Sequence, residues 1–135
     1  MRIAERENAV IKLEKGHEQR YQELTEENFI LVTMAQSAYM KYSERFAQIL
    51  QGEMGNRLPM ADNGVNQAGF YVLVGASMPN VLVETAYLSN RNDEKYLKGR
   101  AGQEKFAEAI FSAVKKYKLE YEKALEEGKE LGSSN

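Results

Sequence analysis

Residues 67–90 read QAGFYVLVGASMPNVLVETAYLSN and contain two short runs of β-branched and aromatic residues, at 70–74 and 81–83. Glycine, proline and asparagine bound both runs, a pattern typical of short buried strands. Only the six residues Gly75–Asn80 join them. A parallel crossover needs a dozen or more residues, so strands that pair directly here pair antiparallel. The stretch predicts two strands within an α/β fold.

Helical patterns flank this stretch on both sides. A charged amphipathic helix is expected over 2–15, and a long helix over 25–54, where a threonine N-cap precedes two glutamates. After the strands, Asn90 is expected to cap a short helix over 92–98, and a last helix begins near Gln103. Apolar residues three or four apart define one face of each long helix: Leu31, Ala35, Ala38, Tyr42, Phe46 and Ile49 in one, and Phe106, Ile110, Ala113, Tyr117 and Tyr121 in the other.

Composition limits the classes of function. The 135 residues suit one domain, and 18 Lys+Arg against 20 Asp+Glu give a formal net charge of −2, which removes the electrostatic argument for nucleic acid or an anionic membrane. Cysteine is absent, and the single histidine, His17, cannot build a His-rich metal site. No apolar run approaches the roughly 20 residues of a membrane span, and no signal peptide is apparent.

The order of these elements suggests an incomplete domain. The body of the domain is expected over 1–127, with a helical segment over 2–54, strands and motif over 67–90 and helices over 92–127; 128–135 is expected to be a flexible tail. Two strands cannot make an independently stable sheet. Part of the domain is therefore expected to lie outside this chain.

The stretch 67–90, continued by Asp93, Glu94 and Leu97, resembles the C-terminal half of zinc-dependent N-acetylmuramoyl-L-alanine amidases with the amidase-3 catalytic domain. The resemblance rests on QAGF, VLVE and SN followed by the two acidic residues, and it extends over most of 3–118. It implies the C-terminal part of an open mixed-sheet, three-layer α/β domain, with two short strands and three to four helices in this chain.

The resemblance implies a role for Glu84, which ends the VLVE run. The family hydrolyses the amide between N-acetylmuramic acid and the L-alanine of the stem peptide, and the corresponding glutamate is the general acid/base. Just past the end of a buried strand, partial burial of Glu84 would raise its pKa toward the working pH. On local pattern alone, Glu84 is interpreted as a solvent-facing carboxylate that happens to follow a strand, and the catalytic role comes from the resemblance.

The resemblance also implies a zinc ion bound by two histidines and a glutamate, but the two histidine motifs of the family do not occur in this chain. Their ligands are expected upstream of Met1, so the chain is expected to be the C-terminal portion of a longer enzyme, or the product of a misplaced start, and inactive alone. His17 is interpreted as a surface histidine, because zinc normally takes three protein ligands. Glu14 is interpreted as an exposed helix charge rather than part of an autoinhibitory helix.

Partners and location follow from the resemblance. Peptidoglycan or muropeptides are the expected partners, in the periplasm or cell wall, and a regulatory partner or self-association through an exposed helix or sheet edge is also considered. The competing hypothesis is a non-catalytic, amidase-like interaction module that binds a partner through its long helix. The stripe of Tyr39, Tyr42 and Phe46 favours core packing over a partner groove. Asn90 is sufficiently explained as a helix cap, and the charge run over 120–130 as a solvated helix face.

Overall fold

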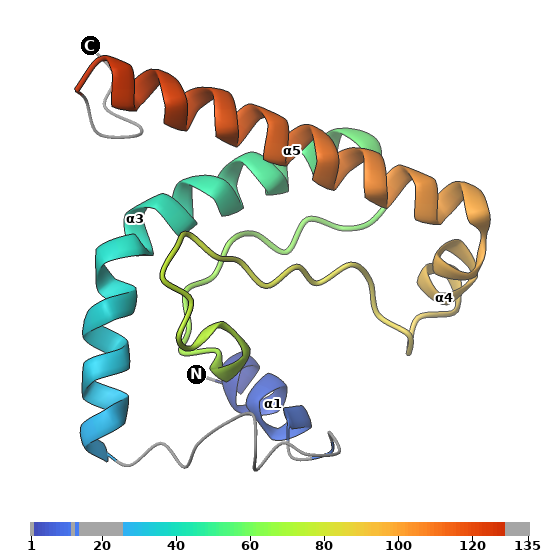
Figure 1. Ribbon diagram of the computed structural model, residues 1–135. Coiled ribbons are helices and arrows are strands. Elements are labelled where there is room, and N and C mark those ends of the chain that lie inside the picture. The colour runs from blue at the N-terminus through green and yellow to red at the C-terminus, as the bar shows by residue number, and fades with distance from the viewer. Residues whose placement is uncertain (1, 12, 14–25, 129–135) are drawn as a thin grey trace. The chain divides into compact units, whose positions relative to one another are not determined.

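The computed structural model describes residues 2–11, 13 and 26–128 of the chain (Figure 1). Within these residues the regular structure is entirely helical, and there is no strand. The expected α/β class, with two short strands in a mixed sheet, is therefore wrong for this structure. The elements in order are α1 (Arg2–Ile11), α3 (Glu26–Arg57), the single 3₁₀ turn η1 (Tyr71–Leu73), α4 (Arg91–Lys98) and α5 (Arg100–Glu126).

The two runs that predicted strands take other conformations. The first forms η1, where the Leu73 amide donates to the Phe70 carbonyl at 3.1 Å. The second, 81–83, is irregular and half-buried. A strand is held by hydrogen bonds to a neighbouring strand, and β propensity depends on that context. Neither run has such a neighbour among the described residues, so the propensity of their side chains is not expressed. The sheet edge considered for self-association is likewise absent from this part of the chain.

The chain divides into two compact units. The first is drawn from Met1–Ser43 and Asn66–Leu82, and the second from Glu44–Val65 and Val83–Asn135. The helix α3 therefore contributes its first part to one unit and its last part to the other. The stretch 67–90 also divides between the units, because its residues before Val83 belong to the first unit and the rest to the second.

In the first unit, α1 packs against η1 (Figure 1). The Asn8 side-chain amide donates to the Gly69 carbonyl at 2.8 Å, which ties α1 to the backbone just before η1. The Asn80 amide donates to the Ser43 hydroxyl of α3 at 3.0 Å. Side-chain amides and hydroxyls thus satisfy backbone groups that lack a regular partner in this irregular stretch.

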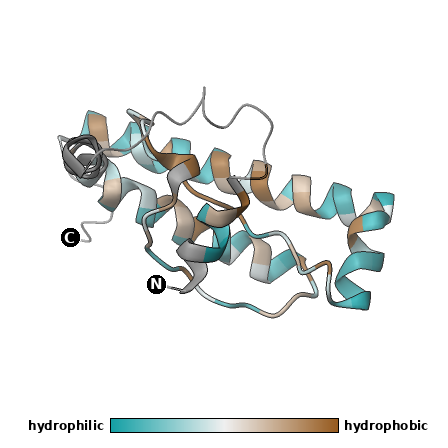
Figure 2. Cartoon of the chain, turned by 90° about the horizontal axis from the view of Figure 1, so that it is seen from below, coloured by the Kyte–Doolittle hydropathy of each residue, from teal (hydrophilic) through white to brown (hydrophobic). Residues whose placement is uncertain are grey.

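In the second unit, the last part of α3 runs antiparallel to α5, because later residues of α3 meet earlier residues of α5. The rings of Phe46 and Tyr117 lie with their centroids 4.8 Å apart, and the Arg45 guanidinium donates to both carboxylate oxygens of Glu120 at 2.9 Å. Hydrophobic residues recur between hydrophilic ones along α5 (Figure 2). Among the residues whose burial the structure describes, the buried apolar side chains belong to this unit: Leu50, Leu58, Phe106, Ala109 and Ala113.

The helices α4 and α5 meet at one residue, Gly99. Its amide donates to the Tyr96 carbonyl at 3.2 Å to end α4, and its carbonyl accepts from the Gln103 amide at 3.1 Å to begin α5. The ring of Tyr96 lies edge-on to that of Phe106, with centroids 6.0 Å apart. Gly102 is buried where α4 and α5 meet, directly against the backbone of Tyr96.

The helix predictions were largely confirmed. The long helix continues three residues beyond the expected end, to Arg57, and its expected threonine cap lies outside the described residues. The first helix is shorter than expected and ends at Ile11. The last helix begins at Arg100, and its predicted face is buried or half-buried. None of the described helices is long and apolar enough to cross a membrane.

The structure also tests two predictions about side chains on these helices. The half-buried ring of Phe46 packs on Tyr117, so the core interpretation of its stripe is confirmed there. The charge run from Glu120 onward is mostly exposed, as expected of a solvated face. Glu120 itself departs from that prediction, because it is half-buried and paired with Arg45 of α3.

Candidate functional site

Glu84 lies in the irregular backbone that leads to α4, and its side chain is exposed. The residue before it, Val83, is half-buried. The expected position at the end of a buried strand, with partial burial of the carboxylate, is therefore wrong for this structure. The reason is the same as for the fold: the described residues form no sheet around 81–83 that would bury this carboxylate.

A turn immediately downstream fixes the backbone of this segment. The Asn90 amide donates to the Tyr87 carbonyl at 2.9 Å and closes the turn. The Tyr87 amide donates to Oδ2 of Asp93 at 3.2 Å. Both backbone groups of Tyr87 are therefore bonded to residues at the start of α4.

Asn90 caps α4, as predicted. Its side-chain oxygen accepts from the amides of Asn92 at 2.9 Å and Asp93 at 3.4 Å, and its own backbone is extended. Its carbonyl accepts from the Glu94 amide at 2.9 Å, which is the first bond of the helix. The cap satisfies amides that the first turn of a helix leaves without partners. The same residue closes the Tyr87 turn, so it also takes part in holding the Glu84 segment.

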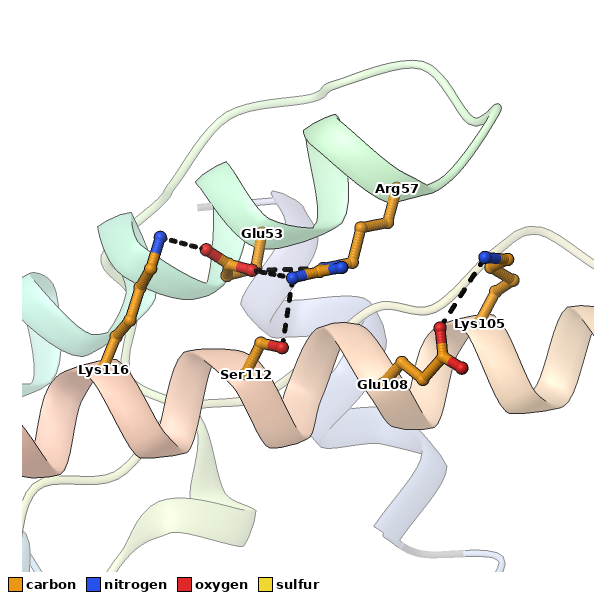
Figure 3. Close-up of polar contacts among 6 residues, drawn as sticks. All are labelled: Glu53, Arg57, Lys105, Glu108, Ser112 and Lys116. Atoms are coloured by element: carbon orange, nitrogen blue, oxygen red, sulfur yellow. Dashed lines mark hydrogen bonds and ion pairs between the residues drawn. The ribbon is translucent and has the colours of Figure 1, made fainter.

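A second polar cluster joins α3 to α5, and the sequence analysis did not single it out (Figure 3). Glu53 of α3 is only 4 % exposed. One of its carboxylate oxygens pairs with the Lys116 ammonium of α5, and the other accepts from the Arg57 guanidinium at 2.8 and 3.1 Å. Arg57 also donates to the Ser112 hydroxyl at 3.1 Å.

The two cations set the electrostatics of this cluster. The hydrogen bonds from Lys116 and then from Arg57 hold the pKa of Glu53 below its ordinary value, against the opposing effect of burial. Both cations are partly exposed, whereas the carboxylate is not. The cluster therefore reads as a clamp between helices. Only the spacing of Glu53 and Arg57, four residues apart on one helix, could have indicated half of it from sequence.

The donor set for a metal is incomplete in this structure. Among the residues described, no three histidine, cysteine, aspartate or glutamate side chains are grouped so that they could hold a metal ion. His17 and Glu14 lie outside the described residues. The residues described around Glu84 therefore do not fit the zinc site that the resemblance implies.

The comparison with known families matches residues 7–116 to Amidase_3, described as N-acetylmuramoyl-L-alanine amidase. This chain belongs to the N-acetylmuramoyl-L-alanine amidase family. The match includes Glu84, the Tyr87 turn and the cap of α4, so the family inferred from residues 67–90 is confirmed.

Curated relatives of this amidase family align with a limited part of the chain. The chain is similar to the N-acetylmuramoyl-L-alanine amidase AmiC of Escherichia coli O6:H1, at 37 % identity over 84 residues, which is 62 % of this chain and 20 % of that protein. The AmiC of Neisseria meningitidis serogroup B is 34 % identical over 87 residues, 64 % of this chain and 21 % of that protein. The amidase LytC of Bacillus subtilis is 39 % identical over 75 residues, 56 % of this chain and 15 % of that protein.

These alignments set the scale of the relationship. The chain spans about one fifth of the length of the first two relatives and less of the third. No solved structure matches it.

Proposed function

We propose that this chain is part of a peptidoglycan amidase and carries its general acid/base, Glu84. The substrate would be the amide between N-acetylmuramic acid and the L-alanine of the stem peptide. The observation that carries this proposal is the family match over 7–116, which includes an exposed glutamate on a segment whose backbone is fixed at Tyr87. A general base needs access to water and a defined position, and this segment offers both.

The chemistry assigned to Glu84 is proton transfer. As water attacks the amide carbonyl, the carboxylate of Glu84 takes a proton from that water. When the carbon–nitrogen bond breaks, the same proton passes to the leaving nitrogen, which departs as the amine of L-alanine. The lactyl group of the sugar keeps the new carboxyl group, and Glu84 returns to its ionised form.

The metal is a separate part of the proposal. The described residues do not form a zinc site. We therefore propose that zinc and its ligands are supplied by residues that are not part of this chain, and that the purified chain has no amidase activity alone. Because the proposed substrate is peptidoglycan, we place the activity in the periplasm or cell wall.

The test joins the full 135-residue chain to the E. coli AmiC relative, in place of the 84-residue stretch that the two share. Release of stem peptides from purified peptidoglycan is measured with zinc present. The fusion should be active, and Glu84→Gln should lower kcat by about 100- to 10,000-fold, the usual contribution of general acid–base catalysis. The matched control is Glu108→Gln, an exposed glutamate on α5 with a loose ion pair at 3.7 Å, and it should be silent.

Two results would contradict the proposal. A fusion that keeps its activity with Glu84→Gln would show that this carboxylate is not the general acid/base. A folded fusion without activity would favour the competing hypothesis, a non-catalytic interaction module. The observation that favours this alternative is the exposure of the apolar side chains of Met34 and Met40 on the long helix α3, where a partner could bind.

A further inference from the structure

We propose that Asp93 is a positioning residue for Glu84. Its carboxylate holds the backbone of the segment that carries Glu84 against the first turn of α4. This inference rests on the proposed function, because it assigns Asp93 a role in the work of Glu84. Asp93 would not touch the substrate, and it would act through the backbone amide of Tyr87.

Hydrogen bonds, rather than burial, hold the turn after Glu84. The side chains of Tyr87 and Leu88 are 54 % and 72 % exposed, so they contribute little apolar contact. The Tyr87 amide donates to Asp93 at 3.2 Å, and the Tyr87 carbonyl accepts from Asn90 at 2.9 Å. Of these two bonds, the one to Asp93 is made by a side chain, so a single substitution removes it without changing the backbone of the turn.

Asp93 is itself held in place by its neighbours. It lies in the first turn of α4 and is half-buried, and its amide donates to the Asn90 side chain at 3.4 Å. The helix α4 packs against α5. A site is held more precisely when its supporting residues stand on a rigid element.

Tyr87, whose amide Asp93 holds, is close to Glu84 along the chain. Glu84 precedes Tyr87 by three residues, so even a fully extended backbone places their Cα atoms within about 11 Å. Fixing Tyr87 therefore restricts where Glu84 can lie. Misplacement of a catalytic group by about 1 Å can lower the rate by about 100-fold.

The neighbouring acid serves as a matched control. Glu94 also lies in the first turn of α4, so it has a similar relation to the helix dipole. Its carboxylate pairs with Lys98 at 2.6 Å on the same helix and not with the Tyr87 backbone. Replacing Glu94 with alanine should therefore remove one negative charge from the first turn of α4, as replacing Asp93 does, but should leave the Tyr87 backbone in place.

The experiment uses two readouts on Asp93→Ala, Asp93→Asn and Glu94→Ala. Amide hydrogen exchange of Tyr87 is measured in the full chain, and kcat and KM for peptidoglycan are measured in the AmiC fusion. Asp93→Ala should remove protection of the Tyr87 amide and lower kcat by about 10- to 100-fold, with KM nearly unchanged. Asp93→Asn keeps an acceptor oxygen and should restore most of both readouts, and Glu94→Ala should change neither.

The outcomes separate this inference from the proposed function. If Glu84→Gln is inactive but Asp93→Ala keeps its kcat or its Tyr87 protection, the role of Asp93 is wrong and the function of Glu84 stands. If Asp93→Asn is as impaired as Asp93→Ala, the hydrogen bond is not the cause and the inference fails. If Glu84→Gln is fully active, the proposed function fails, and exchange at Tyr87 still reports whether Asp93 holds the turn. Should Asp93→Ala not fold, Asp93→Leu replaces it, because leucine is close to aspartate in size and has no acceptor, and the same loss of Tyr87 protection and of kcat is expected.

Discussion

Lys116 of α5 forms an ion pair with Glu53 of α3, although the two residues are 63 positions apart and the carboxylate is almost completely buried. The Lys116 side chain is 62 % exposed, so the lysine reaches inward from the surface to meet the acid. Arg57 occupies the other carboxylate oxygen. The acid is therefore neutralised from both sides, which is the condition under which a buried carboxylate is tolerated.

The clamp should make stability depend on acid pH. Because the folded-state pKa of Glu53 is lowered from about 4.5, its contribution is fully present above the unfolded-state pKa. It is lost as pH falls through the lower, folded-state value. We expect the Tm of the wild-type chain to fall on acidification below about pH 4.5 more steeply than that of Glu53→Gln.

Thermal melts of the wild-type chain and of Glu53→Gln between neutral and acidic pH measure this difference. The contributions of all other carboxylates are common to both chains, so they cancel in the comparison. At neutral pH, Glu53→Gln should have the lower Tm, since the variant loses two ion pairs. Glu108→Gln, whose ion pair is exposed and loose, is the control and should melt like the wild type. Parallel pH curves for wild type and Glu53→Gln would contradict the assignment.

Glycines in the two long helices should respond oppositely to alanine. At Gly102 a Cβ would overlap the Tyr96 carbonyl oxygen and lie 2.9 Å from the carbonyl carbon, so the backbone must move. At Gly52 of α3 nothing lies within 4 Å. We expect Gly102→Ala to destabilise by about 1–3 kcal/mol, and Gly52→Ala to stabilise by about 0.5–1 kcal/mol. Urea unfolding measures both; a stabilised Gly102→Ala would mean that α4 does not approach α5 this closely.

The cap of α4 should have a measurable contribution to stability. Asn90→Ala removes the acceptor for the amides of Asn92 and Asp93 and should cost about 0.5–2 kcal/mol, whereas Asn90→Asp keeps an acceptor and should cost little. Chemical unfolding monitored by circular dichroism gives the difference. Equal stability of the alanine and aspartate variants would show that the side chain does not cap the helix in solution.

Zinc content tests the metal part of the proposal directly. After exposure to excess zinc and desalting, the purified 135-residue chain should retain almost none, because the described residues offer no group of three suitable ligands. The measurement is elemental analysis per mole of chain. A content of about one zinc per chain would mean that His17 and nearby carboxylates form a site, contrary to the interpretation of His17 as a surface residue.

The features that sequence predicted correctly are local ones. The face that contains Phe106 and Ala113 follows from a spacing of three and four residues, and the cap at Asn90 follows from one side chain and the amides that come next. The family was recognised from a contiguous motif around Glu84. Each of these signals lies within a few turns of chain.

The features that sequence missed depend on distant partners. The run at 81–83 has the composition of a strand, but a strand needs a neighbour to pair with, and composition does not supply one. The burial of Glu53 depends on Lys116 of another helix, and no pattern in the sequence of either helix predicts that contact. The exposure of Glu84 likewise depends on what surrounds 81–83, which the motif does not encode.

The junction at Gly99 has a mechanical consequence. One residue joins α4 to α5, and Gly102 lies directly against the backbone of Tyr96, so the angle between the two helices cannot close further without a backbone shift. The longer helix, α5, has 27 residues, a length of about 40 Å. The shorter helix, α4, begins at the residues that form hydrogen bonds with the Tyr87 backbone. A displacement of α5 would therefore move α4 and, through Asp93 and Asn90, the backbone of Tyr87, three residues after Glu84.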